Sequence, residues 1–330
     1  DAAQNRRQST EFVYTHFDNG WVFDHKGDTW SLRPVWASHW GAKWIGTRAK
    51  RILAMSATLI SGDQVAADLG LPEPCVTVSV TGGFDPQLRP IYLAPICDLR
   101  SKGGEGQPKA IPEAEIDKLC TGLAGILARH PRDRILVHCH TYKLARQIYE
   151  RLDSPRLMTY DPGGRDEGLQ AYLQADAAVL IAPSLERGVN LPDDNCRVVV
   201  WAKVPFPNLG DPVVQRRRYS GGPAGARWYS VETIRAVVQG CGRAVRHSED
   251  WAETYILDSA FMGIWRKDKR LLPGWFTAAV RTNFDVRSLM RDGERYLRVR
   301  SAAKNARLAA GMPIPQRRPA ITGTRSRRPS

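Results

Sequence analysis

The chain has 330 residues, of which 42% are apolar and 25% charged, and its formal net charge is +14. This length and composition are typical of one or two globular domains with a sizeable core. No stretch approaches ~18 uninterrupted apolar residues and no basic-then-apolar leader stands at the start, so we expect neither a membrane span nor a secretory signal.

The first 50 residues are rich in aromatic side chains. The chain begins at Asp1 rather than Met, which favours a fragment of a longer protein. Residues 1–50 read as strands and loops that lead into a core strand at Arg51–Ala54. Their tryptophans either stack bases or pack into a core, and core packing is the favoured interpretation. Five of them are irregularly spaced, at Trp21, Trp30, Trp36, Trp40 and Trp44.

Between residues 90 and 290, short apolar runs alternate with helical segments. Apolar residues at helical spacing predict helices over 143–152 and 232–245. Strands are predicted over 135–140, 179–182, 198–202 and 255–257. Short strands of three to six residues separated by helices predict an α/β fold with a parallel sheet covered by helices on both faces.

Two segments read as flexible or extended. Ser101–Pro108 has the composition of a linker. Residues 291–330 carry 11 Lys and Arg against Asp292 and Glu294 alone, and we expect a basic disordered tail there. Such a tail either attracts phosphate chains or only keeps the protein solvated, and the charge does not decide between the two.

The cysteines and histidines do not predict a metal site. None of the six cysteines has CxxC spacing, so reduced thiols in a cytoplasmic protein are expected. His138, Cys139 and His140 are adjacent, but strand alternation would place Cys139 on the opposite face from the two histidines. We therefore predict no metal bound by this chain.

The strongest motif is Gln239-Gly-Cys-Gly-Arg-Ala-Val-Arg246. On a helix, Gln239, Arg243 and Arg246 would share one face, and Gly240 and Gly242 would allow close approach of the backbone. Arginine offers planar, permanently charged donors that match phosphate oxygens. The pattern predicts a polyanion site, with an ordinary basic helix face as the alternative.

Polar turns also follow three of the expected strands, where ligands bind in such sheets. They are Ser56-Ala-Thr58, His140-Thr-Tyr142 and Ser184-Leu-Glu-Arg-Gly188.

Taken in order, these segments resemble the motifs of superfamily-two helicases of the DinG/XPD type. Gln239–Arg246 fits the Q-x-x-G-R-x-x-R pattern of motif VI, and Ser56–Thr58 looks like motif III. Leu136–Lys143 resembles motif IV and Ser184–Pro192 motif V. The loop Val204-Pro-Phe-Pro207 is similar to the loop that follows motif V in that family.

The resemblance implies a RecA-like fold and a role for each matching residue. Arg243 and Arg246 would be arginine fingers that reach ATP bound on another motor domain, and Gln239 would sense its γ-phosphate. The nucleotide side of the cleft would be formed by Glu186, Gly188, Asn190 and Gly242.

The same resemblance implies contacts to DNA. Thr141 and Ser184 would touch the phosphate backbone of a single strand, and Ser56 and Thr58 would couple the ATP state to DNA grip. Asn190 departs from the family, in which Asp is usual at this position.

A nucleotide cradle is missing from the sequence. It contains no G-x-x-x-x-G-K-[ST] segment and no acidic run to hold Mg²⁺. The resemblance implies that an N-terminal motor domain of the same protein holds ATP and Mg²⁺, so this chain alone should be inactive. We expect the end of that first domain with motif III at 1–60, a linker at 61–84, a RecA-like domain at 85–290 and the tail at 291–330.

The function implied is that of a DNA helicase in its C-terminal motor half. It would translocate on single-stranded or forked DNA, 5′ to 3′, as a cytoplasmic monomer with a role in DNA repair. The alternatives are a nucleic-acid-binding module without catalysis, an RNA helicase of the same superfamily, and a hydrolase that uses Glu186.

Overall fold

The structure, a computed structural model, describes residues 20–27, 29–41, 43, 47–48, 50–71, 75–80, 83–102, 110–183, 185, 189–310, 312–313 and 319–322. The chain forms two compact units. The hairpin unit comprises residues 1–80 and 206–235, and the sheet unit comprises 81–205 and 236–330. This division differs from the domain boundaries expected from the sequence, because residues 206–235 belong to the first unit.

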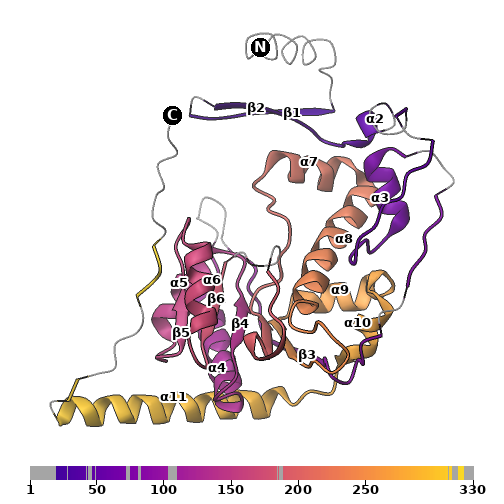
Figure 1. The fold of residues 1–330 in the computed structure, drawn as a ribbon. Helices are drawn as coiled ribbons and strands as arrows, with labels where there is room; N and C mark the ends of the chain where they lie inside the picture. The colour runs from indigo at the N-terminus through magenta and orange to yellow at the C-terminus, as the bar shows by residue number, and fades with distance from the viewer. Residues whose placement is uncertain are drawn as a thin grey trace. The chain divides into compact units, whose positions relative to one another are not determined.

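A seven-stranded parallel sheet forms the centre of the sheet unit (Figure 1). Its order is β5-β6-β4-β7-β8-β3-β9. The strands are β3 (Ile91–Cys97), β4 (Ile135–His138), β5 (Leu157–Thr159), β6 (Val179–Ala182), β7 (Val198–Trp201), β8 (Glu253–Asp258) and β9 (Val280–Arg281). The predicted α/β fold with a parallel sheet is confirmed.

Strand alternation separates the two faces of the sheet. On one face, Ile135 and Val137 of β4 join a buried cluster with side chains from three helices. These helices are α4 (Glu113–Arg129), α5 (Tyr142–Arg151) and α11 (Val286–Ala309). The opposite face carries fully buried His138 and Trp201. The sheet is therefore buried on both faces, which is why its strands are continuous apolar runs.

The predicted helix at 143–152 is confirmed as α5. Thr141 precedes it, and its hydroxyl accepts a hydrogen bond from the amide of Leu144 at 3.2 Å. The strand expected over 135–140 ends earlier, at His138, because His140 has a left-handed backbone with φ of 64°. The chain therefore turns immediately after β4, and His140 does not continue the alternation of the strand.

The helix expected at 232–245 is shifted in the structure. Helix α8 spans Gly222–Cys241, so Arg243 and Arg246 lie beyond its end. The Gly242 amide still donates to the carbonyl of Val238, but the Arg243 amide donates to that of Gly240, which tightens the turn and ends the helix. The prediction that Gln239, Arg243 and Arg246 share one helical face is therefore wrong.

The hairpin unit holds the two-stranded antiparallel sheet β1 (Trp21–Lys26) and β2 (Thr29–Pro34). Helices α2 (Ser38–Gly41), α3 (Gly62–Leu69) and α7 (Pro212–Ser220) also belong to this unit, as does the first part of α8. The core strand expected at Arg51–Ala54 is wrong: the segment forms no strand, and Leu53 is 81% exposed. No strand within the described part of this unit pairs with it, and an unpaired segment gains no ladder of hydrogen bonds.

The early tryptophans divide between packing and exposure. Trp36 packs on a small core of Val22, Val35 and Val213, as the favoured interpretation predicts. Trp30 is 63% exposed and stacks on the ring of Phe23 at 5.0 Å. Trp44 lies outside the described residues.

The basic C-terminal stretch is helical over much of its length. Helix α11 covers residues 291–309 of the expected disordered tail, which corrects that prediction. The helix packs along α4: Leu289 is fully buried, and a Cβ added at Gly293 would lie 1.9 Å from the carbonyl oxygen of Thr121. Close contact with α4 therefore supplies the stability that the exposed basic face lacks. Residues 323–330 and the linker residues 103–108 lie outside the described part of the chain.

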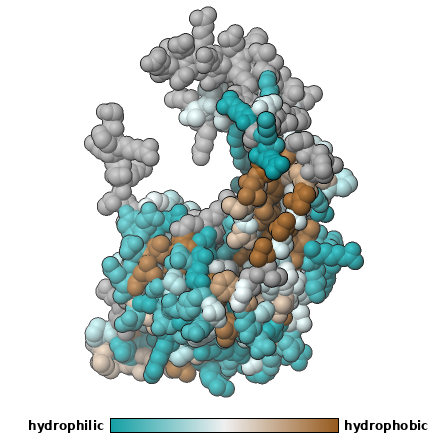
Figure 2. Space-filling view, turned by 45° about the vertical axis from the view of Figure 1, so that its right-hand side comes forward, coloured by the Kyte–Doolittle hydropathy of each residue, from teal (hydrophilic) through white to brown (hydrophobic). Residues whose placement is uncertain are grey.

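The remaining elements are short. They are α6 (Arg165–Gln174), η2 (Asp193–Asn195), α9 (Phe261–Lys267), η3 (Lys269–Leu271) and α10 (Gly274–Ala279). Within the described residues, none of the helices has the length and apolar character needed to cross a bilayer. Figure 2 shows a surface that is hydrophilic over much of the view and interrupted by hydrophobic patches.

Candidate functional site

The carboxyl ends of the parallel strands meet at one edge of the sheet unit, where ligands bind in such folds. Asp258, at the end of β8, joins three chain segments there. Its buried carboxylate accepts hydrogen bonds from the amides of Val204 at 3.0 Å, Ala260 at 3.1 Å and Leu99 at 3.5 Å. Burial raises the pKa of this carboxyl group, and the three amides oppose that rise. Asp258 thus fixes the loops after β3, β7 and β8.

An aromatic stack lies on the sheet face under the end of α8. The rings of His138 and Trp201 are stacked at 4.3 Å, and both side chains are fully buried. Gly240 packs directly on Trp201, because an added Cβ would lie 2.2 Å from the indole ring. This close approach explains why a glycine stands at position 240 of the helix. The missing side chain allows α8 to pack against the sheet, and the position is not on an exposed surface.

Burial keeps the imidazole ring of His138 neutral. Burial, together with the neighbouring charge of Arg243, lowers the pKa of His138 to about 3. A neutral ring leaves Arg243 as the cationic side chain at this point. The guanidinium of Arg243 donates a hydrogen bond to the carbonyl oxygen of Val189, in the segment that follows β6. Arg243 thereby connects the motif that ends α8 to the preceding motif, which includes Asn190.

A buried carboxylate holds the loop that carries Arg246. Asp250 is 1% exposed, and its Oδ2 accepts a hydrogen bond from the Arg246 amide at 3.0 Å and from the Asp193 amide at 3.5 Å. Its Oδ1 accepts from the Arg197 guanidinium at 2.7 Å and from the Trp251 amide at 2.9 Å. We call these five residues the Asp250 cluster; they tie the loop before β7 to the loop after α8.

The Arg246 side chain points to solvent from this fixed backbone. The residue is exposed, and its guanidinium takes part in no ion pair within the described part of the chain. Arg243 and Arg246 therefore differ in the structure: one guanidinium is bonded to a carbonyl, and the other is presented outward.

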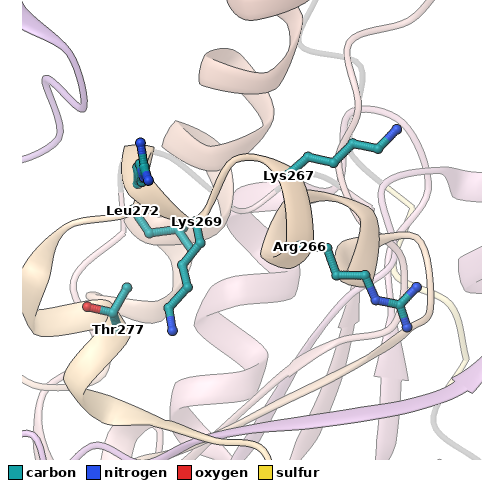
Figure 3. Close-up of a pocket in the computed structure, with 6 residues that line it drawn as sticks. Arg266, Lys267, Lys269, Leu272 and Thr277 are labelled. Atoms are coloured by element: carbon teal, nitrogen blue, oxygen red, sulfur yellow. The ribbon is translucent and has the colours of Figure 1, made fainter.

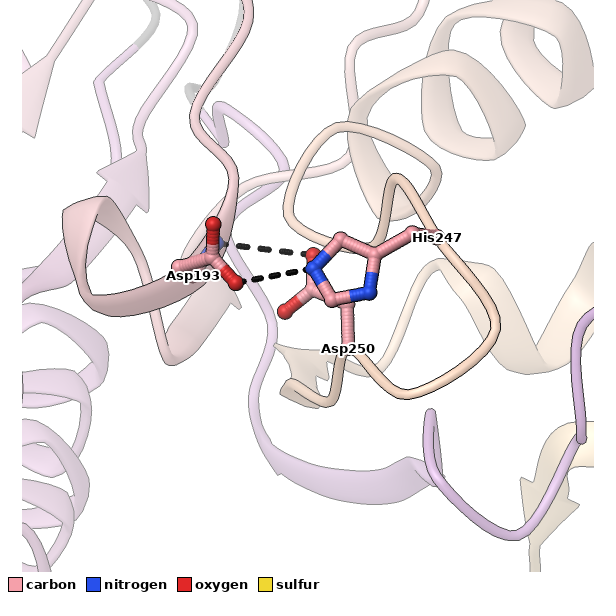
Figure 4. A group of neighbouring side chains, drawn as sticks. All are labelled: Asp193, His247 and Asp250. Atoms are coloured by element: carbon pink, nitrogen blue, oxygen red, sulfur yellow. Dashed lines mark hydrogen bonds and ion pairs between the residues drawn. The ribbon is translucent and has the colours of Figure 1, made fainter.

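Asp193, His247 and Asp250 lie close enough to hold a cation, since their ligand atoms are within 4.8 Å of one another (Figure 4). His247 Nε2 is 2.9 Å from Asp193 Oδ1, and this hydrogen bond raises the pKa of His247. However, Asp250 already receives the Arg197 guanidinium and three amides. A cation would compete with that guanidinium, so the donor set fits an ion-paired cluster better than a metal site.

Three other residues predicted from the sequence, Thr141, Asn190 and Gly242, have different environments in the structure. Thr141 is half-buried at the start of α5, with its hydroxyl oxygen used by the Leu144 amide. Asn190 is exposed, and Gly242 follows the last residue of α8. Ser184, Glu186 and Gly188 lie outside the described residues.

The motif III residues belong to the hairpin unit. The Thr58 amide donates to Ser56 Oγ at 3.2 Å, and the two hydroxyl groups are 3.5 Å apart. Ser56 is exposed and Thr58 is 8% exposed. The hydroxyl pair therefore forms a local turn.

Asp250 and Arg197 are residues that sequence reasoning missed. Asp250 closes a Ser-Glu-Asp turn, and Arg197 stands just before a strand, so both read as surface residues. Their sequence separation is 53 residues, and nothing in either segment signals the partner.

The fold and these sites define a class, the RecA-like α/β domains. Among the solved structures, an XPD helicase superposes with a TM-score of 0.58 at 13% identity, over 79% of this chain and 48% of that one. Residues 124–279 match the family model described as a helicase C-terminal domain.

Curated relatives agree. The Fanconi anemia group J protein homolog of Gallus gallus is 29% identical over 160 residues, which are 42% of this chain and 13% of that protein. The ATP-dependent DNA helicase CHL1 of Saccharomyces cerevisiae is 28% identical over 165 residues, covering 44% of this chain and 19% of that protein. The Regulator of telomere elongation helicase 1 homolog of Aedes aegypti is 24% identical over 277 residues, covering 72% and 26%. The matches thus span about a quarter or less of each relative.

The chain thus contains a helicase C-terminal domain at residues 124–279 and is similar to superfamily-two helicases of the DinG/XPD type, to whose C-terminal half it fits. The resemblance drawn from the motifs is confirmed at this level.

Proposed function

We propose that this chain is the C-terminal motor half of an ATP-dependent DNA helicase. The helicase would couple ATP hydrolysis to translocation on single-stranded DNA, 5′ to 3′, and to duplex unwinding. Beside the family relationship, one observation carries the proposal: Arg246 presents an exposed guanidinium from a backbone that the buried Asp250 holds in place. An outward cation on a fixed backbone suits a partner that binds and leaves in each cycle.

Arg246 would act on a nucleotide that another motor domain supplies. The 330 residues contain no phosphate-binding G-x-x-x-x-G-K-[ST] segment, so ATP and Mg²⁺ would be held mainly by an N-terminal motor domain. A guanidinium placed beside the transferring phosphoryl group neutralises developing charge, an effect worth roughly 10³–10⁵ in rate in related phosphoryl transfers. Alone, this chain would not hydrolyse ATP.

The remaining roles are divided between the two motif regions. Arg243 would hold the Val189 segment in register with the Arg246 loop, as its hydrogen bond to the Val189 carbonyl suggests. Gln239 would sense the γ-phosphate, and Gly242, Glu186, Gly188 and Asn190 would border the nucleotide.

The DNA contacts would come from hydroxyl groups. Thr141 and Ser184 would donate to strand phosphates, while Ser56 and Thr58 would couple nucleotide state to DNA grip. We further propose that the protein acts as a cytoplasmic monomer. The buried free thiols of the sheet unit fit a reducing compartment.

The test is ATP turnover by a protein that joins this chain to its P-loop motor domain. Single-stranded DNA should stimulate turnover strongly and single-stranded RNA weakly. Equal stimulation by RNA would favour an RNA helicase, and binding of DNA without any stimulated turnover would favour a non-catalytic binding module.

A further inference from the structure

Four cationic side chains gather in the connection between β8 and β9. They are Arg266 and Lys267 at the end of α9, and Lys269 and Arg270 in η3. All four are exposed, and none takes part in an ion pair within the described part of the chain.

Three other arginines of the sheet unit do form ion pairs. Arg129 pairs with Asp292 at 2.8 Å, Arg146 with Asp161 at 2.8 Å and Arg197 with Asp250 at 2.7 Å. Like charges held together without partners repel one another, which costs stability unless a ligand compensates.

The four cations line a pocket of about 630 Å³, which we call the basic pocket (Figure 3). Among the residues that the structure describes, Leu272 and Thr277 complete the lining, and no carboxylate belongs to it. In Figure 3, Lys269 points toward Thr277 while Arg266 and Lys267 spread in other directions. The charges are therefore distributed along a surface, as an extended anion requires, rather than converging on one point.

Aromatic packing fixes the frame of the basic pocket. Lys269 Nζ lies 4.4 Å from the ring centre of Trp265 in α9. The buried Arg89 guanidinium lies 4.3 Å from the ring centre of Trp275 in α10, and Phe276 is fully buried next to it. A packed layer thus holds the backbone that carries the cations, and the Trp265 ring positions the end of Lys269.

We propose that the basic pocket binds consecutive phosphates of single-stranded nucleic acid, outside the helicase motifs. The proposal rests on the function proposed above for the choice of nucleic acid. The pocket combines exposed cations with half-buried tryptophans. Grooves for single strands use this combination to follow a phosphate backbone without reading its sequence. Such a site would retain the strand while the motor cleft opens.

The test is equilibrium binding of labelled oligo(dT) to the 330-residue chain, without ATP, over a range of salt concentrations. The variant Lys269→Gln/Arg270→Gln should bind roughly three- to tenfold more weakly at low salt. The slope of log K against log salt should become shallower by about 1.4, because each lost phosphate contact on a single strand contributes about 0.7. Both residues are exposed, so circular dichroism and thermal unfolding should match those of the parent protein.

The matched control is Arg295→Gln/Arg298→Gln on the exposed face of α11, which lowers the net charge equally. We expect the control to change the affinity and the slope clearly less. Equal effects of both variants would show that only net charge matters, and no effect of the pocket variant would show that these cations do not contact the strand. Either result would overturn the proposal.

Two competitors identify the ligand chemistry. Inorganic tripolyphosphate should displace oligo(dT) only at concentrations far above those at which unlabelled oligo(dT) competes, and poly-glutamate should compete poorly. Efficient displacement by tripolyphosphate would identify a site for small polyphosphates, and displacement by poly-glutamate a site for acidic protein; either result contradicts the proposal. Because no ATP is turned over, this outcome is independent of the ATPase test of the motor.

Discussion

The Asp250 cluster and the basic pocket use the same charged side chains in opposite ways. In the Asp250 cluster, the Arg197 side chain is 11% exposed and meets a carboxylate that is 0% exposed. In the basic pocket, four exposed cations are joined by no carboxylate from the described residues of the lining. Arginine next to a buried carboxylate fixes a loop, and arginine without one leaves a surface ready for an external anion.

This difference separates structure from recognition in the sheet unit. The paired charges hold the backbone of Arg246, whose side chain then remains outward. Removing a paired charge should therefore lower stability, whereas removing an unpaired charge should lower only binding. The following predictions test this division, from the largest expected effect to the smallest.

Replacing the buried carboxylate should have the largest effect on stability. Asp250→Ala leaves the Arg197 guanidinium with only the exposed Asp194 as a carboxylate partner and leaves three amides without this acceptor, and should lower the free energy of unfolding by about 3–5 kcal/mol. Urea unfolding followed by tryptophan fluorescence measures the loss. The control Asp161→Ala breaks the exposed pair with Arg146 and should cost at most about 1 kcal/mol. Equal losses in both variants would remove the distinction.

The packing beneath the same loop gives the next effect. Gly240→Ala should lower the free energy of unfolding by about 1–3 kcal/mol, because the new methyl group would lie within 2.2 Å of the Trp201 ring. The control Gly263→Ala in α9 has open space around the new methyl group and should stabilise the helix by up to about 1 kcal/mol. Thermal unfolding of the two variants should shift in opposite directions, and a stabilising Gly240→Ala would contradict the observed packing.

The charge of His130, a third charged group of the sheet unit, can be removed by raising the pH. Burial opposes the charge of His130, but hydrogen bonds with Glu253 and Asp133 outweigh it and raise the pKa of His130. A raised pKa means that the folded protein holds the proton more tightly. The stabilisation is therefore complete below the unfolded pKa, near 6.5, and is lost as the pH rises through the folded pKa.

The free energy of unfolding should accordingly decrease as the pH rises above 6.5, and His130→Gln should flatten that decrease. Urea unfolding at a series of pH values measures both slopes. An unchanged slope in His130→Gln would assign the dependence to another group.

The basic pocket should contribute least to stability. Lys269→Gln/Arg270→Gln should change the free energy of unfolding by no more than about 0.5 kcal/mol, or raise it slightly by relieving repulsion. A loss comparable to that of Asp250→Ala would mean that these cations are structural.

Features that depend on local sequence could be predicted, and features that depend on contacts between distant residues could not. Val179–Ala182 and Val198–Trp201 were predictable as strands, because a strand buried on both faces is a continuous apolar run. The motif order also predicted the family. These signals are local or depend on spacing alone.

What could not be predicted depends on distant partners. Helix α8 ends at Cys241, next to the position where Gly240 packs on Trp201, and Asp250 and Arg197 hold the loop that carries Arg246. The helical order of residues 291–309 depends on α4, and charge composition alone indicated disorder. Tertiary contacts thus place Arg243 and Arg246 beyond the end of α8, whereas the sequence pattern predicted that both lie on one face of a helix.

The most direct test of the motor assignment is Arg246→Ala in the protein that includes the P-loop domain. DNA-stimulated ATP turnover should be abolished while equilibrium binding of ATP stays nearly unchanged, because Arg246 would act on the reacting phosphates and not on ground-state affinity. The control Arg132→Ala removes another exposed arginine of the sheet unit and should leave turnover intact. Turnover in Arg246→Ala equal to that of the control would contradict the assignment.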